Sequence, residues 1–227
     1  MSTVDDVIAE LAALEDPRMR AVNEKHGDDH GINLTKLRAV AKPFKTDQRL
    51  ALQLWATGQT PARLVALLVC SPRAFDADEL DTMMRDPRVP KVTDWFVNYV
   101  VKKSPLADQL RERWFDDPDP VVAAAAWSLT SVRVAKRPEG LDVDALLDQI
   151  EREMKDAPAA LQWSMNETLA QIGIYHPAYR ARALEIGEKL QVLADYPTSP
   201  GCTSPFAPAW IGEMVRRREG AAALPGR

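Results

Sequence analysis

One stretch of the chain carries polar and charged side chains at helical spacing. Lys91, Asp94, Asn98 and Lys102 follow one another at intervals of three and four residues, so they share one face of a helix, with Trp95 at its edge. A carboxylate, an amide and two ammonium groups beside an indole could form part of a binding surface. The same pattern is also typical of an ordinary solvated helix face, and the sequence leaves both interpretations open.

A second stripe of this kind is formed by Trp163, Asn166, Glu167 and Ala170. A polar pair flanked by a tryptophan could line a ligand groove. A tryptophan on a second helix face is equally common where one helix packs on the next repeat. We take Trp163 and Asn166 as candidate binding residues.

Basic residues gather in short segments, although the chain as a whole is acidic. Five positive charges lie close together at Lys36, Arg38, Lys42, Lys45 and Arg49. Clustered lysines and arginines can bind phosphates even when the net charge is negative. The alternative is the solvated surface of an ordinary helical repeat.

The sequence gives little support for a metal site or for a catalytic nucleophile. His26 and His30 flank a Gly-Asp-Asp segment, but no third strong ligand is evident, so we expect a polar loop, no metal site and no cofactor. Cys70 and Cys202 are the two cysteines, which excludes a disulfide scaffold and indicates a reducing cytoplasm. Neither Cys202 nor His176 lies in a nucleophile signature.

The elements that must position these residues are marked by prolines. Seven prolines follow a side chain that can accept a hydrogen bond. The pairs are Asp16-Pro17, Thr60-Pro61, Ser71-Pro72, Asp86-Pro87, Ser104-Pro105, Asp119-Pro120 and Ser204-Pro205. Such an acceptor can cap the free N–H groups of a helix start, and proline at the first helical position loses no hydrogen bond. The sequence therefore predicts seven helix starts at these pairs.

Between these pairs the apolar residues recur at helical spacing, and no segment shows sustained strand alternation. The pattern predicts an all-α protein with about a dozen helices of roughly 10 to 18 residues. The pattern predicts antiparallel helix pairs in units of roughly 35 to 45 residues, the period of HEAT-like repeats. A compact helical bundle is the alternative. We expect one solenoid domain over residues 1–219 and a disordered tail over 220–227, while the role of the Pro-rich segment 197–208 stays open.

Length and charge narrow the class of protein. The chain has 227 residues and a formal net charge of −4, which argues against a purely electrostatic nucleic-acid binder. No apolar run is long enough for a membrane span, and Met1–Asp6 is acidic with no apolar segment behind it, so we expect no signal peptide. The expectation is a monomeric cytoplasmic protein.

Several segments resemble a known family. They are His30–Lys42, Arg49–Trp55, Pro61–Val69, Trp163–Gly173 and Gly201–Pro208. Together they are similar to the AlkD-like DNA alkylation repair family, over most of the chain. The resemblance implies a HEAT-like α-solenoid that binds duplex DNA, including alkylated DNA, on a basic concave face. With this resemblance, the basic cluster and the polar stripe described above give candidate DNA contacts at Lys36, Arg38, Lys42, Lys91, Trp95 and Lys102.

The catalytic branch of that family excises cationic alkylated purines. A carboxylate beside the sugar stabilises the developing positive charge, aromatic side chains contact the deoxyribose, and an arginine holds the backbone. In this sequence the carboxylate position falls on Asn98, the first aromatic on Asp94, the arginine near Ala124 and the second aromatic near Glu167. A register shift of one turn would make Asp94 the acid, with Trp95 beside it.

The candidate catalytic residues are therefore Asp94, Asn98 and Glu167. Because an amide supplies no negative charge, we expect a DNA-binding protein with weak or no alkylpurine glycosylase activity. The alternative is a non-catalytic HEAT-repeat scaffold that binds a protein or a small ligand.

Overall fold

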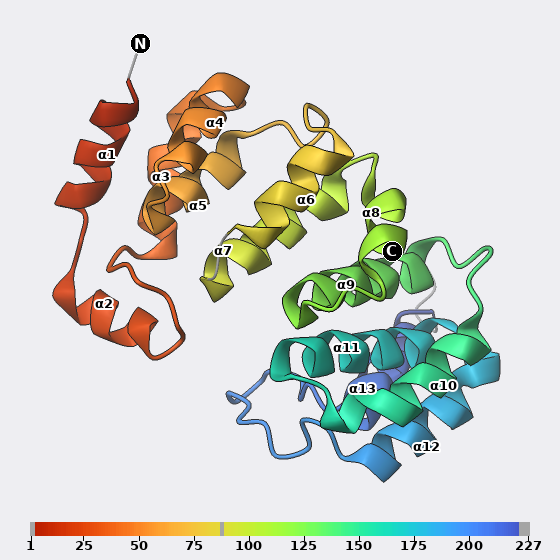
Figure 1. Ribbon diagram of the computed structural model, residues 1–227. Helices are drawn as coiled ribbons and strands as arrows, with labels where there is room; N and C mark the ends of the chain where they lie inside the picture. The colour runs from red at the N-terminus through yellow and green to blue at the C-terminus, as the bar shows by residue number, and fades with distance from the viewer. Residues whose placement is uncertain (1–2, 87–88, 223–227) are drawn as a thin grey trace. The chain divides into compact units, whose positions relative to one another are not determined.

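The computed structural model describes residues 3–86 and 89–222, and all regular structure in these ranges is helical (Figure 1). This confirms the all-α prediction. The chain forms two compact units that divide between Leu110 and Arg111. The single domain expected over residues 1–219 remains a prediction. None of the described helices is long and apolar enough to cross a membrane.

The first unit is built from short helices around an aliphatic core. They are α1 (Val4–Ala13), α2 (Pro17–Glu24), α3 (Leu34–Ala41), α4 (Gln48–Ala56), α5 (Thr60–Val69), α6 (Ala77–Arg85) and α7 (Pro90–Trp95). A 3₁₀ turn, η1 (Lys42–Phe44), follows α3. The α7 helix continues into a π-helical turn, η2 (Phe96–Val100), and a 3₁₀ turn, η3 (Val101–Lys103). Leu37, Leu54, Leu64 and Phe96 are completely buried in the core.

The second unit contains the two longest helices. It holds α9 (Pro120–Lys136), α10 (Val143–Glu153), η4 (Met154–Asp156), α11 (Ala159–Tyr175), η5 (Pro177–Tyr179), α12 (Arg180–Leu190) and α13 (Ala207–Ala222). The α8 helix (Ala107–Trp114) spans the division between the units. In the second unit α11 packs against α9, α12 and α13. Buried Trp127, Ile150 and Leu169 belong to one core cluster there.

Two of the predicted helix starts form as expected. The Asp16 and Asp119 carboxylates accept hydrogen bonds from first-turn N–H groups of α2 and α9, and a proline occupies the first turn of each helix. At Thr60-Pro61 the helix begins one residue earlier, with Gln59 as its N-cap. Local capping chemistry thus located these starts closely.

The other predicted starts shift or fail. The Ser104 and Ser204 hydroxyls accept from the N–H of Leu106 and Phe206, and α8 and α13 begin shortly afterwards. The helix start predicted at Ser71-Pro72 is wrong, because residues Ser71 to Ala74 form a turn closed by a 3.0 Å backbone hydrogen bond.

The true start of α6 lies further on, at the capping box of Asp76 and Glu79. Asp86 ends α6 instead of starting a helix, and Pro87 lies outside the described residues.

The C-terminal end is more helical than expected. The α13 helix runs to Ala222, so residues 220–222 of the predicted disordered tail are helical. Residues 223–227 lie outside the described part of the chain.

Candidate nucleic-acid interface

The polar stripe of the first unit forms a connected chain of hydrogen bonds. The Asn98 amide nitrogen donates to Asp94 Oδ1 at 2.8 Å and to the Asp94 carbonyl at 3.0 Å. Lys102 Nζ then donates to Asn98 Oδ1 at 2.9 Å. The Asn98 side chain is thereby oriented from both ends, with its nitrogen towards the carboxylate and its oxygen towards the ammonium group.

The backbone under this chain is not a regular α-helix. The η2 turn is π-helical and buries Phe96, Val97 and Val100, while Asn98 and Tyr99 project from it. Single π turns inside helices occur frequently at functional sites. The amide nevertheless lies between a carboxylate and an ammonium group, because Asp94, Asn98 and Lys102 follow one another at intervals of four residues.

Beside the polar chain lies a cluster of aromatic and cationic side chains. The Trp95 and Tyr99 rings meet edge to face at 5.2 Å. The Arg38 guanidinium lies 5.0 Å from the centre of the Trp95 ring, and Arg38 Nη2 donates to the Tyr99 hydroxyl at 3.3 Å. Lys103 Nζ lies 5.1 Å from the centre of the Tyr99 ring. Trp95 is 4% exposed, so it supports Arg38 and presents little ring surface to a ligand.

The remaining basic candidates differ in position. Lys42 follows Arg38 by four residues on the same face, whereas Lys36 precedes Arg38 by two and faces another direction. Lys91 lies in the first turn of α7, where its backbone N–H donates to the buried Asp28 carboxylate at 3.0 Å. The contacts thus bring Arg38 and Lys103 to one pair of rings, while Lys102 binds the Asn98 side chain one helical turn away.

In the second unit the predicted stripe divides into exposed and buried members. Asn166 is 2% exposed, and its amide donates to the Pro205 carbonyl at 2.8 Å, so it holds the 197–206 segment against α11. Trp163 is 40% exposed and meets the Tyr196 ring at 5.2 Å. Glu167 is half-buried on α11, and Ala124 is buried on α9.

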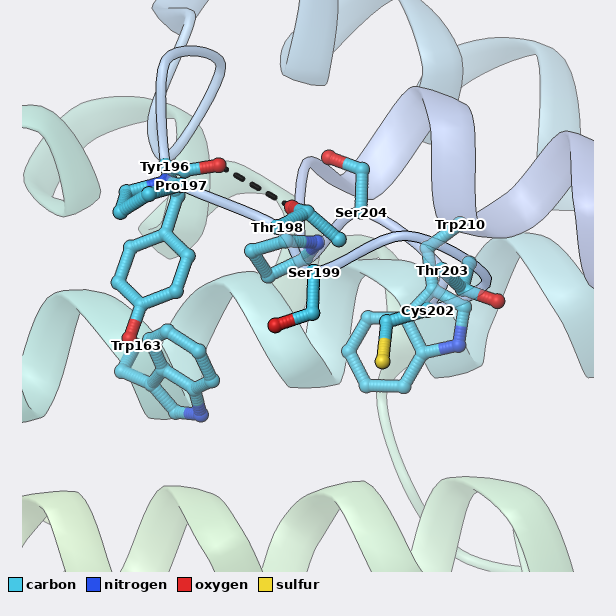
Figure 2. A pocket seen from close by; sticks show the side chains of 10 residues that line it. Trp163, Tyr196, Pro197, Thr198, Ser199, Cys202, Thr203, Ser204 and Trp210 are labelled. Atoms are coloured by element: carbon cyan, nitrogen blue, oxygen red, sulfur yellow. Dashed lines mark hydrogen bonds between the residues drawn. The ribbon is translucent and has the colours of Figure 1, made fainter.

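A groove of about 400 Å³ opens between α11, α13 and the irregular segment that precedes α13 (Figure 2). Its lining is aromatic and hydroxylic. It consists of Trp163, Tyr196, Pro197, Thr198, Ser199, Cys202, Thr203, Ser204, Pro205 and Trp210. Figure 2 shows the Ser199 hydroxyl between the Trp163 and Trp210 rings.

The His26–His30 loop has a structural role in the first unit. His30 is buried, and its Nδ1 accepts from the Ile32 N–H at 3.2 Å, while Asp28 reaches α7. Burial lowers the pKa of His30. Within residues 3–86 and 89–222 no group of three or more histidine, cysteine or acidic side chains could hold a metal ion.

A family model described as DNA alkylation repair enzyme matches residues 7–211. The chain belongs to the DNA alkylation repair enzyme family. It is 22% identical to an uncharacterised protein of Listeria innocua and 21% identical to one of Listeria monocytogenes. Each match spans 226 residues, 96% of this chain and 99% of the relative.

A solved structure shares the fold, with a TM-score of 0.77 and 21% sequence identity. The match covers 96% of this chain and 95% of the chain in that structure. It is described as a new family of proteins related to the HEAT-like repeat DNA glycosylases, with affinity for branched DNA structures. The HEAT-like fold expected from the sequence is thus confirmed.

Three residues that complete these surfaces, Tyr99, Tyr196 and Trp210, were not among the candidates found from the sequence. Tyr99 had a detectable signal, since it lies four residues after Trp95. Tyr196 and Trp210 had none, because no helical period connects them to Trp163.

Proposed function

We propose that this chain binds duplex DNA, including alkylated DNA, as a monomer, and that it has weak or no alkylpurine DNA glycosylase activity. The observation that carries the proposal is the hydrogen-bonded chain from Asp94 through Asn98 to Lys102. An amide stands where the resemblance to the catalytic branch expects an acid.

DNA binding is assigned to a basic surface of the first unit, defined as Arg38, Lys42, Lys102 and Lys103. Arg38 and Lys103 approach the same tyrosine from two elements, α3 and η3. Phosphate contacts from clustered cations supply most of the non-specific affinity of DNA-binding proteins. Family membership and the branched-DNA affinity of the structural neighbour support this assignment.

The expectation of weak or no glycosylase activity follows from the charges around Asn98. Excision of a cationic purine builds positive charge on the sugar, and an anion placed there stabilises the transition state by several kcal/mol, of order 3 to 4. Asn98 offers only a dipole, and the nearby Asp94 carboxylate is already bound by the Asn98 amide. The backbone-holding arginine is also absent at Ala124, which weakens positioning.

The test is an electrophoretic mobility shift on duplex DNA at two salt concentrations. We expect micromolar binding that weakens steeply with salt, because binding releases counterions. The Arg38→Gln variant should bind more weakly, and Arg152→Gln, on the exposed face of α10, serves as the matched control. Absence of salt-sensitive binding would favour the alternative, a non-catalytic protein- or ligand-binding scaffold.

A further inference from the structure

The groove of the second unit exposes aromatic surface that no neighbouring side chain covers fully. Trp163 is 40% and Tyr196 48% exposed, and both are among the few large apolar side chains open to solvent in the described chain. Their rings meet edge to face, which leaves ring faces available for stacking. Trp210 contributes a third ring to the same groove.

The rest of the lining is polar but uncharged. Ser199, Thr203 and Ser204 supply hydroxyls and Cys202 a thiol, and none of the ten lining residues carries a formal charge. Such groups can donate to and accept from the edge of a heteroaromatic ring. They offer no ionic partner to a phosphate, so the groove suits a flat, uncharged ring rather than a charged group.

The groove is preformed by local hydrogen bonds. Asn166 holds the Pro205 carbonyl from α11, and the Cys202 N–H donates to the Ser199 carbonyl at 3.0 Å. Thr198 Oγ1 donates to the Tyr196 carbonyl at 3.1 Å (Figure 2). A volume of about 400 Å³ lies in the range of small-molecule sites. Because the walls are held in advance, less ordering entropy is lost on binding.

We propose that this groove binds one unstacked nucleobase. The inference deepens the proposed function, on which it rests for the source of that base in a DNA strand. Aromatic rings bind exposed bases by stacking with little sequence preference. Fully paired duplex offers no such base, whereas a bulge, a junction or a single strand does. A free nucleotide carries the same ring and is the second possible source.

The experiment compares three fluorescein-labelled DNAs by anisotropy: a paired duplex, the same duplex with one unpaired thymine, and oligo-dT. Thymidine monophosphate, followed by quenching of tryptophan fluorescence, tests the free nucleotide. We expect tighter binding of the DNAs with unpaired bases. Trp163→Ala and Tyr196→Ala should each remove roughly tenfold of that affinity and leave paired duplex unchanged. Trp163→Phe should retain most of it.

Tyr175→Ala is the matched control, because Tyr175 is an exposed ring on the same helix outside the groove lining. Circular dichroism melts verify that each variant folds. If the wild type binds all three DNAs equally and the groove variants change none, the groove proposal is wrong while DNA binding stands.

Failure of DNA binding itself is a separate result. If no DNA binds, the proposed function is wrong. The titration with thymidine monophosphate then shows whether the groove binds a base. Quenching that is lost in Trp163→Ala would then support a nucleotide site. No quenching would overturn the groove proposal as well.

Discussion

At the scale of single residues, the proposed lack of glycosylase activity rests on Asn98. Its amide is oriented by Asp94 and Lys102, so an aspartate there would face the Lys102 ammonium group directly. An Asn98→Asp variant would place a carboxylate where the catalytic members of the family are expected to have one. The same change would also put two carboxylates side by side, because Asp94 is the other neighbour.

The corresponding prediction concerns release of 7-methylguanine or 3-methyladenine from methylated DNA. We expect little release by the wild type and an increase of roughly tenfold or more in Asn98→Asp, since an anion stabilises the oxocarbenium-like sugar. Liquid chromatography of the freed bases measures the rate. Asn98→Ala, which adds no charge, is the control.

Two outcomes would contradict this assignment. Robust wild-type excision that disappears in Asp94→Ala would show that Asp94 is the working acid and that the register is shifted by one turn. Robust excision that survives Asp94→Ala would point to another acid, with Glu167 the first to test.

We expect His30 to make the first unit sensitive to acid. Its Nδ1 accepts a hydrogen bond, so the folded state needs the neutral ring, and burial lowers the pKa of His30. The surrounding charges oppose this in part, since Asp28, Glu15 and Asp29 raise that pKa while Arg20 lowers it. Below the ordinary histidine pKa of about 6.5 the unfolded chain binds more protons, so the free energy of unfolding falls as pH falls.

Urea unfolding at pH 7.5, 6.5 and 5.5 measures this loss. We expect His30→Asn to flatten the pH dependence, because its Oδ1 can accept from the Ile32 N–H without titrating. His26→Asn, an exposed histidine in the same loop, should leave the dependence unchanged. Equal slopes in wild type and His30→Asn would refute the assignment.

At the scale of elements, close packing sets the position of α13 and of the groove segment before it. Gly187 on α12 lies against the ring of Pro208, and an added Cβ would come within 2.6 Å of two ring carbons. The proline ring is rigid and cannot rotate away. The α12–α13 contact therefore requires a glycine at position 187.

We expect Gly187→Ala to lower the free energy of unfolding by about 1 to 3 kcal/mol, because overpacking displaces α13. Gly212→Ala is the matched control, since no atom lies within 4 Å of its added Cβ. That change should instead raise stability by roughly 0.5 to 1 kcal/mol through helix propensity. Chemical denaturation of both variants measures the change in the free energy of unfolding, which we expect to be negative for Gly187→Ala and positive for Gly212→Ala. The same change in both variants would argue against the close contact.

At the scale of the whole molecule, the proposed DNA binding has to come from local charge. The net charge of −4 repels a polyanion overall, so attraction has to arise where cations cluster. Replacing Lys102 and Lys103 together by alanine should lower the slope of log affinity against log salt by about two in magnitude.

Lys189→Ala should leave that slope unchanged, because Lys189 is paired with Glu151 at 2.6 Å. Fluorescence titrations at four salt concentrations give the slopes. A double variant with the wild-type slope would exclude the two lysines from the interface.

Much of the helical architecture could be predicted from the sequence because its causes are local. The caps at Asp16 and Asp119 lie next to the N–H groups that they bind, and the spacing of Asp94, Asn98 and Lys102 places them on one helix face. The Ser71-Pro72 prediction failed because the same dipeptide chemistry also closes a turn.

The rest depended on segments that meet only in the folded chain. Arg38 contacts Tyr99 across 61 positions of sequence, and Asn166 contacts Pro205 across 39. The sequence by itself determined the all-helical class, several helix starts and the polar stripe. Only the tertiary structure decided that Trp95 is buried under Arg38, that Asn166 is an anchor, and that Tyr196 and Trp210 join Trp163. Burial and long-range contact are set by how helices pack, and no periodicity within one helix encodes that packing.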